Sequence, residues 1–135
     1  MEAASKGAAE AHGRVVGVTA AGLFRDRSGA NAHVIHEIAA KSITERIGIL
    51  TDLASGAVVL PGSIGTAAEL VVAWNINHVA RRQGGTRFPT VAVGEEWRVF
   101  HKLLAGRLGA DGGDVHIADT TGEALDWLLD QPELH

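Results

Sequence analysis

The chain contains no cysteine and no tyrosine, and its lysines occur only at positions 6, 41 and 102. The absence of cysteine excludes disulfides, thiolate metal ligands and a cysteine nucleophile. No apolar run approaches the roughly 20 residues that a membrane-spanning helix needs, and the first residues lack the profile of a secretory signal peptide. The net charge of −4 attracts neither nucleic acid nor an anionic membrane. We therefore expect a soluble cytoplasmic protein with no nucleic-acid or membrane partner.

What the sequence does contain is typical of one folded domain. Its 135 residues are within the usual size of a single domain. Apolar residues make up 46% of the chain and charged residues 21%, which is enough apolar surface to form a core and excludes a disordered chain.

Short β-rich runs alternate with longer helical patterns along the chain. Strands are expected at 14–19, 57–60, 89–93 and 115–118, with a further short strand at 33–35 inside an irregular loop over 20–37. Helices are expected at 2–11, 38–54, 66–82, 95–108 and 121–129. This alternation predicts an α/β fold, with a parallel sheet of four or five strands covered by helices on both faces. Because the pattern opens on a helix with no strand before it, we expect the chain to begin partway into its fold.

The strongest local signal is a glycine-rich turn between an apolar strand and a helix, Pro61-Gly62-Ser63-Ile64-Gly65-Thr66. Such a turn directs backbone N–H groups and the positive end of a helix toward one point, which suits a phosphate. Gly62 and Gly65 permit positive φ and let a ligand approach the backbone closely. The turn is neither a Walker A loop nor a GxGxxG motif, so an ordinary tight βα turn is the alternative.

Glu69 follows this turn and has two interpretations. Thr66-Ala67-Ala68-Glu69 fits the Thr-x-x-Glu capping box, in which Glu69 is the third helical residue and only caps the helix. In the functional interpretation, its carboxylate lies one helical turn from a phosphate site, close to a phosphorylated sugar.

The helix beyond Glu69 has almost no polar face in its first two turns. Its apolar residues are Leu70, Val71, Val72, Ala73, Trp74, Ile76 and Val79. Such a helix is expected to be buried on two sides, against the sheet and against a second copy of the chain.

Three other polar groups give weaker signals. His33-x-x-His36-Glu37 has no third ligand at a suitable spacing, so no metal site is expected. A solvated helix end is expected for three arginines, with a phosphate or interface role as the alternative: Arg81, Arg82 and Arg87. A helix surface or a dimer contact is expected for three further residues: Asn75, Asn77 and His78.

The segment Pro61–Glu69 resembles the PGGxGTxxE signature of the Lonely Guy (LOG) family, whose members were long labelled possible lysine decarboxylases. Thr44-Glu45-Arg46 is similar to the family's helix with a Glu-Arg pair, and its distance from Pro61 and Glu69 matches the family's spacing. The start of the chain at 1–8, the strand at 14–19 and the segment 119–129 are also similar. The resemblance therefore covers nearly the whole chain.

The resemblance implies a single Rossmann-like domain over residues 1–135 that hydrolyses the N-glycosidic bond of a nucleoside 5′-monophosphate. It implies a homodimer without cofactor or metal, in which Arg46 and Glu69 are the catalytic pair. The alternative for Arg46 is an ion pair on the helix surface. The implied phosphate-binding residues are Gly62, Ser63, Ile64, Gly65 and Thr66.

Three departures from the family pattern qualify this expectation. Ser63 replaces the second glycine of the signature. Ile47 stands where cytokinin-activating members have lysine, which argues against a cytokinin substrate. The family's upstream strand and glycine-rich loop are missing, so the chain is expected to be truncated at its N-terminus.

Other functions stay open at this point. Molybdenum-cofactor carrier proteins share the fold and a Gly-Thr-Ala-Ala-Glu run, so a carrier of a nucleotide-like ligand is one alternative, and a damaged gene product is another. Lysine decarboxylation needs a lysine that forms a Schiff base with pyridoxal phosphate. None of the three lysines is at the glycine-rich turn, which argues against the old label.

Overall fold

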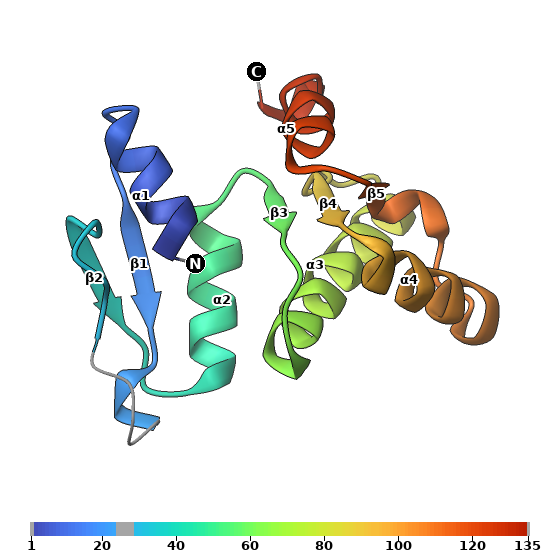
Figure 1. The fold of residues 1–135 in the computed structure, drawn as a ribbon. Helices are drawn as coiled ribbons and strands as arrows, with labels where there is room; N and C mark the ends of the chain where they lie inside the picture. The colour runs from blue at the N-terminus through green and yellow to red at the C-terminus, as the bar shows by residue number, and fades with distance from the viewer. Residues whose placement is uncertain (1, 24–28, 135) are drawn as a thin grey trace. The chain divides into compact units, whose positions relative to one another are not determined.

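The structure is a computed structural model that describes residues 2–23 and 29–134. The chain divides into two compact units, Met1–Leu53 and Ala54–His135, each with its own parallel sheet (Figure 1). Short 3₁₀ turns occur at Ala21–Leu23, Gly112–Asp114 and Pro132–Leu134. Within the described ranges, no helix is both long and apolar enough to cross a membrane.

The first unit contains two parallel strands and two helices. Strand β1 (Val16–Thr19) pairs in parallel with β2 (His36–Ala39), with Val16 opposite His36. Helix α2 (Ile43–Leu53) contacts β1 and buries Ile47, whereas α1 (Glu2–Glu10) buries no residue.

In this unit, two element boundaries predicted from the sequence are wrong. The strand expected at 33–35 is instead β2 at His36–Ala39, and the helix expected from residue 38 begins at Ile43. Residues 36–39 pair with β1, so they cannot also start the helix. The start of α2 is fixed by Ser42, whose Oγ accepts the Glu45 N–H at 3.0 Å, while the Glu45 carboxylate accepts the Lys41 N–H.

The second unit alternates strand and helix throughout. Its elements are β3 (Ala57–Val59), α3 (Ile64–Gln83), β4 (Thr90–Val93), α4 (Glu95–Leu108), β5 (His116–Ala118) and α5 (Thr121–Leu129). The three strands are parallel in the order β3-β4-β5, and all four residues of the central strand β4 are buried.

Helices cover both faces of this three-stranded sheet. Alternate residues of β4 face opposite sides and pack against different helices. Ala92 belongs to a core cluster with residues of α3 and α4 that include Leu70 and Trp97. Val91 and Val93 belong to a second cluster with Ala124 of α5. Figure 1 shows α5 on one side of the sheet and α3 and α4 on the other. The predicted α/β fold, with parallel strands flanked by helices, is therefore confirmed.

A buried polar cluster lies at the amino-terminal edge of this sheet. Asn77, only 1% exposed, donates from Nδ2 to the carbonyls of Phe88 (2.8 Å) and Asp114 (2.9 Å). Its Oδ1 accepts the Phe88 N–H at 2.7 Å. The prediction that Asn77 lies on the helix surface is therefore wrong, because its amide satisfies backbone groups of segments that are distant in the sequence.

Arg81 belongs to the same cluster and is not simply solvated, as the sequence suggested. Its Nε lies 3.1 Å from the carboxylate of Asp114, which is 2% exposed. The hydrogen bond to Asp114 is the main cause that raises the pKa of Arg81 above its ordinary value. Arg87 also approaches Asp114, at 3.7 Å, and donates to the Gly113 carbonyl. Arg81 and Arg87, which the sequence assigned to a solvated helix end, therefore lie where they pair with the buried carboxylate of Asp114.

Candidate functional site

The glycine-rich turn joins the carboxyl end of β3 to the start of α3. Helix α3 begins at Ile64, and Ser63 is an extended N-cap whose side chain makes no capping hydrogen bond. The Ala67 N–H donates to the Ser63 carbonyl at 3.0 Å, which is the start of the helical hydrogen-bond pattern. The N–H groups of residues 63–66 precede that pattern and have no acceptor within the helix. This turn therefore presents backbone donors and a positive helix end at an exposed surface, which suits an anion.

Neither Gly62 nor Gly65 has a positive φ, so backbone conformation does not require glycine at either position. Gly62 is needed because the Thr66 side chain packs closely against its Cα. A Cβ at residue 62 would lie 2.8 Å from Cβ of Thr66 and still closer to its hydroxyl. A Cβ at residue 65 would meet no atom within 4 Å. The two glycines of the motif are therefore not equivalent: Gly62 is required by the folded turn, and Gly65 leaves open space beside the backbone.

Glu69 is not the third residue of its helix, so the predicted capping box with Thr66 is wrong. Because α3 begins at Ile64, Thr66 is the third residue and Glu69 is the sixth. Glu69 is half-buried and is three residues beyond Thr66, so the two share one helix face. The carboxylate therefore belongs to the helical turn that follows the backbone donors.

A capping box does form at the start of α5. The Thr120 hydroxyl accepts the Glu123 N–H at 3.2 Å, and the Glu123 carboxylate accepts the Thr120 N–H at 3.3 Å. The same residue pattern therefore has different structures at α3 and α5.

The first turn of α4 lies against the glycine-rich turn, a feature that the sequence analysis missed. Gly94, the N-cap of α4, has a φ of 114°, and a Cβ there would lie 3.5 Å from Cγ of Pro61. The Trp97 indole N–H donates to the Leu60 carbonyl at 3.2 Å. The sequence signal was weak, because an apolar tryptophan early in a helix looks like any core residue.

Arg46 belongs to the first unit, near the start of α2. It is half-buried, and its Nε donates to the backbone carbonyl of Val18 on β1 at 2.9 Å. This bond fixes the base of the guanidinium near the carboxyl end of β1. The structure thus places Gly62, Ser63, Ile64, Gly65, Thr66 and Glu69 together in the second unit, and it places Arg46 in the first.

The described residues offer neither a cluster of metal ligands nor a buried lysine that would suit pyridoxal phosphate. In residues 2–23 and 29–134, no group of three His, Cys, Asp or Glu side chains could hold a metal ion. The three lysines are exposed, and Lys6 pairs with Glu10 at 3.8 Å. A Schiff-base lysine is usually desolvated, which lowers its pKa, so these residues do not fit that cofactor.

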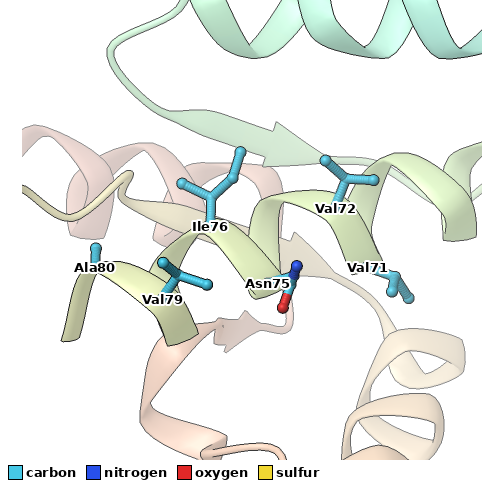
Figure 2. Close-up of a pocket in the computed structure, with 6 residues that line it drawn as sticks. All are labelled: Val71, Val72, Asn75, Ile76, Val79 and Ala80. Carbon is cyan, nitrogen blue, oxygen red and sulfur yellow. The ribbon is translucent and has the colours of Figure 1, made fainter. Parts of the chain in front are cut away.

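One face of α3 carries an apolar stripe. Val71, Val72 and Val79 are 41%, 37% and 42% exposed, and together with Asn75, Ile76 and Ala80 they line a shallow hollow (Figure 2). The opposite face buries Leu70, Ala73, Trp74 and Asn77. All six residues that line the hollow belong to α3, so it is a surface along one helix and not an enclosed site.

The second unit is thus a parallel α/β unit with a glycine-rich turn at the carboxyl end of β3. The chain belongs to the family described as possible lysine decarboxylase, whose model matches residues 1–111. No curated protein matches the chain.

Proposed function

We propose that the protein hydrolyses the N-glycosidic bond of a nucleoside 5′-monophosphate and releases a free base and ribose 5-phosphate. The observation that carries this proposal is the position of Glu69. Its half-buried carboxylate is on the helical turn after the exposed backbone donors of residues 63–66. An anion site and a carboxylate at this spacing suit a phosphorylated sugar, and the LOG resemblance assigns the same residues.

In this mechanism the phosphate accepts hydrogen bonds from the N–H groups of residues 63–66, with Gly62 completing the turn. The bond from C1′ to the base breaks, water forms the new bond to C1′, and the base leaves with a proton. Positive charge develops on the sugar as the base departs, and the Glu69 carboxylate stabilises it. Arg46 is the second member of the pair and orients the carboxylate or binds phosphate through its planar guanidinium.

We also propose that residues 1–135 act as one Rossmann-like domain in the cytoplasm, as a homodimer that uses neither metal nor cofactor. The apolar stripe of α3 in Figure 2 supports the dimer, because exposed valines along one helix face favour contact with a second copy. Light scattering at micromolar concentration is expected to give twice the chain mass. A monomer at that concentration would contradict the dimer without affecting the proposed chemistry.

The activity is tested by incubating the protein with a panel of nucleoside 5′-monophosphates and measuring free base by chromatography. Matched nucleosides without phosphate are the control, and they are expected to be cleaved far more slowly. Base release that depends on phosphate supports the proposal. Tight binding of a monophosphate without base release overturns the hydrolase and favours a carrier of a nucleotide-like ligand. Failure to bind or cleave any of these ligands overturns both functions.

A further inference from the structure

The hydrogen bond from Trp97 to Leu60 links α4 to the residue that precedes the glycine-rich turn. Trp97 is the third residue of α4 and is 5% exposed, and its Nε1 donates to the Leu60 carbonyl at 3.2 Å. Its ring meets Phe100 edge-on, with the ring centroids 5.9 Å apart. Both flanks of the turn, Val59 on β3 and Leu70 on α3, belong to the same buried cluster as Trp97. The tryptophan therefore bonds to one flank of the turn and shares a core with both.

The start of α4 is itself held in place, so Trp97 is attached to a fixed support. The Gly94 N–H donates to the Ala118 carbonyl at the end of β5 at 3.0 Å. Gly94 also lies against Pro61, where a Cβ would be 3.5 Å from Cγ. These contacts connect the ends of β3, β4 and β5 through one helical turn. A movement of that turn would shift the Leu60 carbonyl and, with it, the donors that follow.

We infer that Trp97 is a positioning residue for the phosphate-binding turn: its indole N–H fixes the Leu60 carbonyl and thereby aligns the N–H groups of residues 63–66. This inference rests on the proposed function, because it assumes that the turn binds the phosphate of the substrate. Backbone donors stabilise an anion best when they are held in place before it arrives. Trp97 acts through the backbone and does not itself contact the substrate.

The chain offers a matched control for this role. Trp74 is 3% exposed, and its indole N–H donates to the Asp111 carbonyl at 3.0 Å, in a loop at the opposite edge of the sheet. Trp97→Phe and Trp74→Phe therefore remove the same kind of buried hydrogen bond and the same ring volume. Trp74 belongs to the same core cluster as Trp97, so the two variants differ in which carbonyl loses its indole donor, and only the first change removes the hydrogen bond to Leu60.

The first measurement compares KM and kcat for a nucleoside 5′-monophosphate, with the matched nucleoside as reference. Trp97→Phe is expected to raise KM for the monophosphate about tenfold, the effect of roughly one lost hydrogen bond. Its KM for the nucleoside and its kcat are expected to stay within about twofold of the wild type. Trp74→Phe is expected to leave all three constants unchanged. Equal KM values in the two variants would overturn the positioning role.

The second measurement needs no ligand and so separates this inference from the proposed function. Amide hydrogen exchange of Ala67, whose N–H makes the first helical hydrogen bond of α3 to the Ser63 carbonyl, is expected to be about tenfold faster in Trp97→Phe than in the wild type or Trp74→Phe. If the wild type binds no monophosphate, the proposed function fails, and the exchange rates still decide whether Trp97 orders the turn. Unchanged exchange of the Ala67 amide in Trp97→Phe would overturn the inference even in an active enzyme.

Discussion

Two helices of the second unit carry the same Thr-x-x-Glu pattern near their starts, and the glutamate has a different position in each helix. Thr120-x-x-Glu123 forms a reciprocal capping box at the start of α5. Thr66-x-x-Glu69 fits the same pattern, yet it lies inside α3, which begins at Ile64. The pattern shows which residues can form a cap, and the backbone before it determines whether they do.

The difference comes from the residues that precede each threonine. At α5, Thr120 is extended, with φ −129° and ψ 158°, and helical residues follow at once. At α3, the extended residue is Ser63, and Gly62 leaves room for the Thr66 side chain to fold back over it. The helix therefore starts earlier, and Glu69 is displaced from the third to the sixth position. Because α3 starts early, the Glu69 carboxylate is not part of the helix cap and lies on the helical turn after the backbone donors.

The largest expected effect is on the rate of base release, which should differ between variants of the two glutamates. Glu69→Gln removes the charge and keeps the size, so base release is expected to fall about a hundredfold or more. Glu123→Ala is the control, since it weakens a cap by roughly 0.5–1 kcal/mol and should leave base release unchanged. A Glu69→Gln variant that hydrolyses at the wild-type rate would exclude Glu69 from catalysis.

The next effect tests why α3 begins early. Gly62→Ala puts a methyl group where the Thr66 side chain lies, so it should lower the free energy of unfolding by about 1–3 kcal/mol and weaken monophosphate binding. Gly65→Ala meets no atom within 4 Å and adds a better helix former, so it should stabilise the fold by about 0.5–1 kcal/mol. Urea unfolding of both variants measures the contrast. A loss of stability in Gly65→Ala as large as in Gly62→Ala would contradict this account of the turn.

A smaller effect compares the two threonines directly. Thr120→Ala removes an N-cap and should cost about 1 kcal/mol of stability. Thr66→Ala removes no N-cap, because Ser63 has that position, and should cost less than about 0.5 kcal/mol while weakening monophosphate binding. Thermal unfolding provides the stability values. If Thr66→Ala lowered the free energy of unfolding as much as Thr120→Ala, Thr66 would be a helix cap and this account of α3 would be wrong.

The smallest effect is a pH dependence near the cap of α5. His116 stacks on Trp127, with centroids 4.6 Å apart, and burial lowers its pKa below 6.5, while the charge of Glu123 partly opposes that shift. The folded protein thus binds this proton less readily than the unfolded chain. Stability should decline as the pH falls below 6.5 through the folded pKa. Urea unfolding between about pH 7 and pH 5 should show a shallower decline for His116→Gln, and an unchanged decline would rule His116 out.

Much of the second unit could be predicted from local sequence because its pattern is regular. The helices at 95–108 and 121–129 were placed with the bounds that the structure shows, and the apolar run at 90–93 is the buried central strand. In the first unit, His36–Ala39 has no such apolar run, and it is a strand because β1 supplies its hydrogen-bond partners. A local pattern cannot show a partner that is distant in the sequence.

The same limit applies to the candidate site. The glycine-rich turn and Glu69 were found from a local motif, but the capping role given to Glu69 was wrong, because the helix start depends on the contact of Gly62 with Thr66. Trp97 was not singled out, and Asn77 was assigned to the helix surface, because their hydrogen-bond acceptors, such as Leu60 and Asp114, are far away in the chain. Burial of a polar group depends on tertiary structure, which composition and periodicity do not encode.

The side-chain hydrogen bonds of Asn77 have a consequence for how this sheet can change. They tie α3 to Phe88 and Asp114, which precede β4 and β5, so a slip of either strand would leave a buried amide without partners. Strand alignment is thus secured at one edge, while the glycine-rich turn occupies the other. We therefore expect changes in the loops at the carboxyl edge to leave the register of β4 and β5 intact, because Asn77 aligns these two strands from the other edge.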